Sequence, residues 1–151
     1  MVSESILDDR IDASELEKFR DNYLAECARG NPSTDIIFAY ASALVRSNKK
    51  TIREGVRILK YLIENESRES YQRDYIYYLS LGYAHLNDYD RALAYIDILL
   101  KSEEENHQAV NLKKIIKKKM HKHGFIGVAI FGAFSAVVAG AAIGIVKAVK
   151  S

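Results

Sequence analysis

The feature that most restricts what this chain can fold into is an uncharged stretch of 22 residues, from Phe125 to Val146. As an α-helix with a rise of about 1.5 Å per residue it would be about 33 Å long, and the hydrocarbon core of a bilayer is about 30 Å thick. A buried core helix is the alternative interpretation. Lysines flank the stretch on both sides, which favours a membrane span. The sequence therefore predicts one transmembrane helix.

The position of this stretch predicts the topology of the protein. Only residues 147–151 follow it, so the span would leave the ribosome too late to act as an N-terminal signal. The start, MVSESILDDRID, has neither the apolar core of a secretory signal nor the Arg-rich pattern of a transit peptide. We therefore expect a tail-anchored protein with an N-terminal segment (1–11), a cytosolic helical domain (12–122), an anchor (123–146) and a short tail (147–151) in the lumen or intermembrane space.

The net charge of +2 combines two regions of opposite sign. Residues 1–112 hold 14 Lys or Arg and 20 Asp or Glu, whereas residues 113–151 hold eight lysines and no acid. A nucleic-acid-binding protein would carry its basic residues on the folded domain, so we expect no nucleic-acid partner. Lysines beside a span can bind anionic headgroups or serve as a targeting address, and both readings use the same residues. The lysines assigned to membrane targeting are Lys117, Lys118, Lys119, Lys122, Lys147 and Lys150.

Small residues recur at every fourth position inside the predicted span. They are Gly132, Ala136, Gly140 and Gly144. Such a row allows two membrane helices to pack closely, so a homo-oligomer is one interpretation. The other is that glycine and alanine lower the hydrophobicity of the anchor and direct it away from the endoplasmic reticulum.

The rest of the chain has a helical pattern throughout, with one proline and no alternating strand-like run. We predict six helices, which start near residues 12, 33, 51, 71, 89 and 106. Two of them open with predicted capping boxes, Asp12–Glu15 and Thr51–Glu54.

The second and third helices echo the fourth and fifth at an offset of 37 or 38 residues. Gly55 and Leu59 correspond to Ala92 and Ile96, the small and large packing positions of a tetratricopeptide repeat. An ordinary helical bundle with a chance echo is the alternative. We predict an all-α fold: a six-helix bundle with two tetratricopeptide-like helix pairs, plus a C-terminal transmembrane helix.

Several segments together resemble the mitochondrial fission 1 protein family. They are FAYASALVRS, IREGVRIL, QRDYIYYLSLGYAHLNDYDRALAYIDILL and the Gly/Ala-rich anchor behind lysines. The resemblance covers nearly the whole chain. It implies a cytosolic helical domain tethered to the outer mitochondrial membrane and, in many members, to the peroxisomal membrane. It also implies recruitment of the dynamin-related fission GTPase, directly or through adaptors.

Stacked helix pairs curve, and their first helices line the concave side. The predicted partner-binding groove therefore consists of Ala39, Tyr40, Ala43 and Leu44 beside Tyr77, Tyr78, Leu81 and Gly82. We expect it to bind an amphipathic helix or peptide, with Gly82 open to the partner at the groove floor. The N-terminal segment around Ile6 and Leu7 is a possible competitor. The alternative is that most tyrosines are core residues whose hydroxyl reaches water.

The sequence does not predict an enzyme. It contains no P-loop, GxSxG or HExxH motif, and His121 and His123 have no third metal ligand nearby in sequence, so we expect no metal and no cofactor. The alternative to a fission receptor is a general tail-anchored docking protein, for example for chaperones. A clamp for acidic peptides would need basic residues along the groove, and the expected groove positions are apolar and aromatic.

Overall fold

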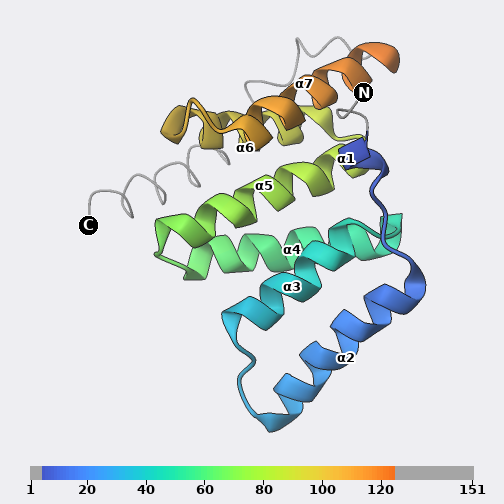
Figure 1. Ribbon diagram of the computed structural model, residues 1–151, viewed down its shortest axis with the longest axis vertical. Helices are drawn as coiled ribbons and strands as arrows, with labels where there is room; N and C mark the ends of the chain where they lie inside the picture. The colour runs from blue at the N-terminus through green and yellow to red at the C-terminus, as the bar shows by residue number, and fades with distance from the viewer. Residues whose placement is uncertain (1–4, 125–151) are drawn as a thin grey trace.

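The computed structural model describes residues 5–124, and all its regular structure there is α-helical (Figure 1). The seven helices are α1 (Ser5–Asp8), α2 (Ala13–Arg29), α3 (Thr34–Val45), α4 (Lys49–Asn65), α5 (Glu69–His85), α6 (Tyr89–Ser102) and α7 (His107–Lys122). The all-α class and the two helix pairs, α3 with α4 and α5 with α6, are confirmed. The six expected helices are α2–α7, and α1 is an additional single turn in the N-terminal segment.

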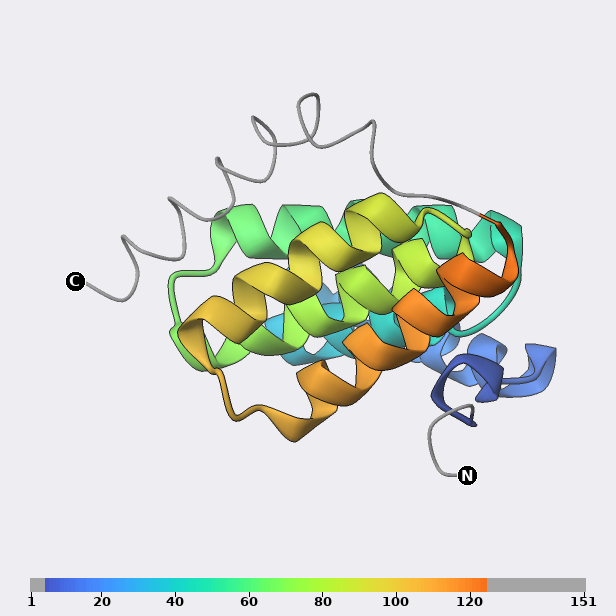
Figure 2. The same ribbon diagram turned by 90° about the horizontal axis from the view of Figure 1, so that it is seen from above.

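Helices α3 to α7 stack as successive neighbours, and α2 lies against α3 at one edge of the stack (Figures 1 and 2). Within residues 5–124, no helix combines the length and the apolar composition needed to cross a bilayer. All of the predicted anchor (123–146) except His123 and Gly124 lies outside the described residues, and so do the small-residue row Gly132, Ala136, Gly140 and Gly144 and the lysines Lys147 and Lys150.

Close approach of the paired helices depends on small residues, as the repeat predicted. A Cβ atom on Gly55 would lie 2.7 Å from Val45 Cγ1 and 2.9 Å from the Ala41 carbonyl oxygen, so only glycine fits between α3 and α4. In the second pair Ala92 is completely buried, and its carbonyl accepts a 2.7 Å hydrogen bond from the buried Ser80 hydroxyl. That bond satisfies a polar group inside the core.

The predicted capping residue at Asp12 is confirmed. Its carboxylate accepts the Glu15 amide (2.8 Å) and the Ser14 hydroxyl (2.7 Å), and these bonds hold the pKa of Asp12 below its usual value.

The second predicted capping box, Thr51–Glu54, was placed three residues too late. The N-cap of α4 is Asn48, whose side chain accepts the amides of Lys50 and Thr51 at 3.1 and 3.2 Å. Thr51 is therefore the third helical residue, and its hydroxyl oxygen accepts the Asn48 amide and lies 3.1 Å from the Leu44 carbonyl oxygen. This hydroxyl thus connects the start of α4 to the end of α3.

Removing this cap is expected to destabilise the domain. Asn48→Ala leaves the first amides of α4 without a side-chain acceptor, so the free energy of unfolding should fall by about 1–2 kcal/mol. Urea unfolding followed by circular dichroism measures this, with the exposed Ser70→Ala as the control. Equal midpoints for the two variants would contradict the assignment of Asn48 as the cap.

Candidate partner-binding site

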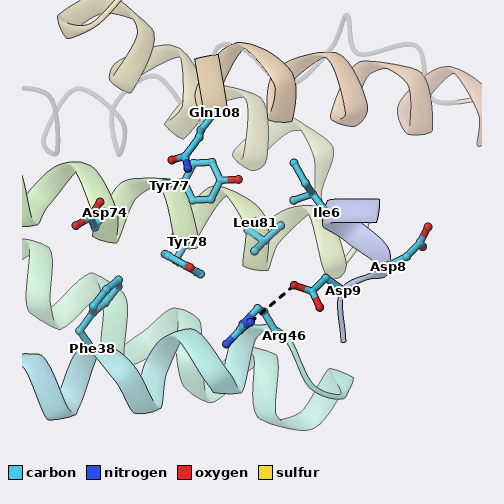
Figure 3. Close-up of a pocket in the computed structure, with 10 residues that line it drawn as sticks. All are labelled: Ile6, Asp8, Asp9, Phe38, Arg46, Asp74, Tyr77, Tyr78, Leu81 and Gln108. Carbon is cyan, nitrogen blue, oxygen red and sulfur yellow. Dashed lines mark ion pairs between the residues drawn. The ribbon is translucent and has the colours of Figure 1, made fainter. Parts of the chain in front are cut away.

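An open cavity of about 840 Å³ lies over α5, between α3 and α7, with the N-terminal segment at one end (Figure 3). Its lining comes from four elements and the turns beside them. The lining residues are Ile6, Asp8, Asp9, Phe38, Arg46, Asp74, Tyr77, Tyr78, Leu81 and Gln108.

The floor of the cavity is a series of edge-packed aromatic rings. The rings of Phe38 and Tyr78 have centroids 5.4 Å apart, and those of Tyr78 and Tyr77 are 5.5 Å apart, both in near-perpendicular arrangement. Both tyrosines are half-buried, and burial raises the pKa of Tyr77. Rings held in this way offer rigid apolar area with a polar tip, which suits the recognition of another protein.

One end of the cavity is formed by the N-terminal segment, which packs into the core and hydrogen-bonds the end of α3. Leu7 is 2% exposed and belongs to the main core, and Ile6 beside it lines the cavity. The Ile11 amide donates to the Arg46 carbonyl (3.1 Å), and the Arg10 guanidinium donates to the Ser47 carbonyl (2.7 Å). The segment is therefore attached to the end of α3 by core and backbone contacts.

The rim of the cavity is acidic. Asp8, Asp9 and Asp74 are exposed, and Arg46 is the one basic residue among those that line the cavity. Arg46 lies 3.9 Å from Asp9, so its charge is partly compensated. A ligand with basic side chains beside an apolar surface would match this arrangement.

Three of the eight predicted groove residues, Tyr77, Tyr78 and Leu81, line this cavity, but Gly82 does not. A Cβ atom on Gly82 would lie 2.9 Å from Val56 Cγ2 and 3.1 Å from Val45 Cγ1. The prediction that Gly82 opens to a partner was therefore wrong, because its missing side chain makes room for α3 and α4.

The four residues predicted on α3 do not line the cavity either. Tyr40 stacks on Tyr23 of α2 with ring centroids 4.9 Å apart, and Ala43 and Leu44 are completely buried beneath α2. Ala39 is half-buried outside the cavity lining. These positions correspond to 77, 78, 81 and 82 of α5 at the offset of 38, but on α3 that face is covered by α2.

Sequence reasoning missed seven of the lining residues. Two had a detectable signal: Asp74 precedes Tyr77 and Tyr78 by one helical turn, and Arg46 follows Phe38 by two turns on the same helix face. Ile6 was predicted as a competitor for the groove and not as part of its lining. Gln108 of α7, Asp8 and Asp9 had no signal, since only tertiary packing brings them to α5.

The targeting lysines of α7 lie near its C-terminal end. Lys117, Lys118 and Lys122 are exposed, and Lys119 is half-buried. Just beyond them, His123 Nδ1 hydrogen-bonds the hydroxyl of buried Tyr89 at 2.7 Å, which joins the end of α7 to the start of α6.

Comparison with known proteins gives a consistent result. A model of the Fis1 C-terminal tetratricopeptide repeat matches residues 73–125. The FIS1-related protein fis-2 of Caenorhabditis elegans is 40% identical over 90% of this chain and 91% of its own length. Mitochondrial fission 1 protein of Homo sapiens is 39% identical over 92% and 91%, respectively.

The fold also resembles a solved structure. Yeast Fis1, crystallised in complex with an Mdv1 fragment containing its N-terminal extension and coiled-coil domains, aligns with a TM-score of 0.68 and 29% identity. The alignment covers 77% of this chain and 90% of that one. The sequence and fold thus agree over most of the chain: it belongs to the mitochondrial fission 1 protein family, whose members are tetratricopeptide-like adaptors and not enzymes.

Proposed function

We propose that the cavity over α5 binds a helical segment of a fission adaptor and thereby recruits the dynamin-related GTPase to the outer mitochondrial membrane. The observation that carries this proposal is the aromatic floor of Phe38, Tyr77 and Tyr78 beneath an acidic rim. The solved complex of yeast Fis1 with an Mdv1 fragment supports an adaptor as the partner.

The occupant we propose is an amphipathic helix. Its apolar side chains would cover the aromatic floor, and its basic side chains would lie beside Asp8, Asp9 and Asp74. A clamp for acidic peptides is disfavoured, because acidic residues at the rim would repel such a ligand. The N-terminal segment supplies part of the wall, so its displacement would alter the site.

Membrane attachment is a further part of the proposal. The division into a helical domain (12–122), an anchor (123–146) and a short tail (147–151) is supported by the uncharged stretch and its flanking lysines. We propose the same anchor for peroxisomes, with their fission as a second role. Self-association through the small-residue row of the anchor remains part of this proposal.

Truncating the aromatic floor should impair adaptor recruitment without changing the location of the protein in the cell. We expect Tyr77→Ala combined with Tyr78→Ala to weaken adaptor binding at least tenfold, about 1.4 kcal/mol or more, since buried aromatic anchors dominate such interfaces. In cells that lack their own copy, this variant should reach mitochondria but leave them long, and peroxisomes should be scored in the same cells.

Tyr61→Ala is the matched control, because Tyr61 is 58% exposed on α4 and does not line the cavity. It should bind the adaptor and shorten mitochondria as the unmodified chain does. If the double variant is folded, correctly located and recruits the adaptor normally, the cavity is not the docking site.

A further inference from the structure

The two ends of the helical bundle carry opposite charge. Figures 1 and 2 place the α3–α4 turn, the α5–α6 turn, the end of α7 and the N-terminal segment at one end. Residues 5–12, 46–53, 85–91 and 117–123, which make up this end, contain ten Lys or Arg and five Asp. Residues 63–74 and 100–107, at the other end, contain three Lys or Arg and seven Asp or Glu.

The topology produces this separation. In an antiparallel stack, every second turn lies at the same end, so segments far apart in sequence contribute to one surface. Lys49, Lys50 and Arg53 open α4 and are exposed, and they lie at the same end as Lys117 and Lys122 of α7. We call this surface the basic end, and the opposite surface, formed by residues 63–74 and 100–107, the acidic end.

The chain also leaves the described domain at the basic end. The contact between Tyr89 and His123 attaches the end of α7 to the start of α6, so residue 124 is held close to this surface. The uncharged stretch begins at the next residue, Phe125. A membrane entered by that stretch would therefore lie next to the basic end.

We propose that the basic end binds anionic phospholipid headgroups, so that the domain stands on the membrane with its acidic end toward the cytosol. This inference rests on the membrane attachment proposed above. It adds Lys49 and Lys50, which lie more than 70 residues before the anchor in sequence, and leaves Arg53 beside them as a position for a label. Anionic lipid attracts basic side chains within a Debye length of about 8 Å at physiological salt, so these residues contribute only in this orientation.

The orientation would also determine the direction of the cavity relative to the membrane. Figure 3 shows Ile6, Asp9 and Arg46 toward one end of the cavity and Phe38, Asp74 and Gln108 toward the other. The first group lies beside the basic end and the second nearer the acidic end. The cavity would thus run away from the membrane, with its far end open to a cytosolic helix.

The full chain in lipid vesicles allows a direct test. Exposed Cys27 is replaced (Cys27→Ser), and a fluorophore is attached through Arg53→Cys at the basic end or, as a control, through Ser67→Cys at the acidic end. The vesicles carry a headgroup-linked nitroxide quencher and consist of phosphatidylcholine with or without phosphatidylinositol. Flotation measures insertion, and quenching measures the distance of the label from the surface.

We expect strong quenching at position 53 in anionic vesicles, less in neutral vesicles or high salt, and weak quenching at position 67 throughout. Lys49→Glu with Lys50→Glu should reduce quenching at position 53 to the neutral-vesicle level. Glutamate is favourable at a helix N-terminus, so α4 should remain folded. Lys18→Glu with Lys101→Glu is the matched control and should have no effect.

Two results would overturn the proposal. If the chain floats with the vesicles but positions 53 and 67 are quenched equally, or if the charge reversal has no effect, the orientation is wrong while the anchor is right. If the chain does not float with the vesicles, the membrane attachment is wrong, and the orientation with it. Neither result depends on adaptor binding, which is measured separately.

Discussion

Gly55→Ala is expected to lower the free energy of unfolding by about 2 kcal/mol, although alanine is the better helix former by about 1 kcal/mol. The added methyl carbon would lie 2.9 Å from both the Ala41 carbonyl oxygen and Leu44 Cβ, and 2.7 Å from Val45 Cγ1. Backbone oxygen and Cβ atoms cannot move without shifting α3. The two helices would therefore separate, and the core contacts of the fully buried Leu59, one turn further along α4, would loosen.

Gly82→Ala provides a graded control for this prediction. Its methyl carbon would approach two valine methyl groups, Val56 Cγ2 at 2.9 Å and Val45 Cγ1 at 3.1 Å, and no backbone atom lies among its nearest neighbours. The smaller strain should leave this variant more stable than Gly55→Ala. Urea midpoints by circular dichroism compare the two, and wild-type stability of Gly55→Ala would contradict the close packing.

Lowering the pH is expected to remove stability through His85, by about 3 kcal/mol between pH 6.5 and pH 4. The imidazole is 6% exposed, and burial lowers its pKa from 6.5 to about 4. Its Nδ1 lies 2.6 Å from the Val45 carbonyl oxygen, and its Nε2 is buried without a hydrogen-bond partner. The folded state therefore favours the neutral ring.

The sign of the effect follows from the direction of this pKa shift. Below pH 6.5 the unfolded chain binds a proton at this position, whereas the folded chain does not until about pH 4. Stability is thus complete above pH 6.5 and is lost as the pH falls toward 4. At pH 5 about 2 kcal/mol should already be missing.

Urea unfolding at pH 7 and pH 5 measures this loss, with His85→Gln as the comparison. The variant should be less stable at pH 7 but should show a much smaller decrease between the two pH values. The exposed His107, His121 and His123 are present in both proteins, so the difference between the two decreases isolates His85. Equal decreases would show that another group is responsible.

Much of the fold could be predicted because helices are encoded locally. Apolar residues at intervals of three and four define helix faces, and the 37–38 residue echo predicted which helices pair. The same periodicity placed Tyr77, Tyr78 and Leu81 on one face of α5, where they line the cavity. It also predicted that Gly55 is needed where two helices approach closely.

Local sequence patterns were less reliable for the exact residues at which helices begin. Asn48 and Thr51 are both good capping residues, so the local sequence allows α4 to start after either of them. Contacts with the end of α3 decide that Asn48 is the cap. The Thr51 hydroxyl contacts the Leu44 carbonyl as well as the Asn48 amide, so the turn between the helices selects the earlier start.

What the sequence alone determined is the helical class, the pairing of helices, the family and two of the three rings of the cavity floor, Tyr77 and Tyr78. Only the tertiary structure decided which helix face stays open. Tyr40 and Tyr78 are equivalent in the repeat, but α2 buries Tyr40 by stacking Tyr23 on it, while Tyr78 remains half-exposed. The burial of Leu7 likewise brings Asp8 and Asp9 to the rim. Periodicity specifies which residues share a face, but the neighbour that covers that face is selected by apolar area buried between segments distant in sequence.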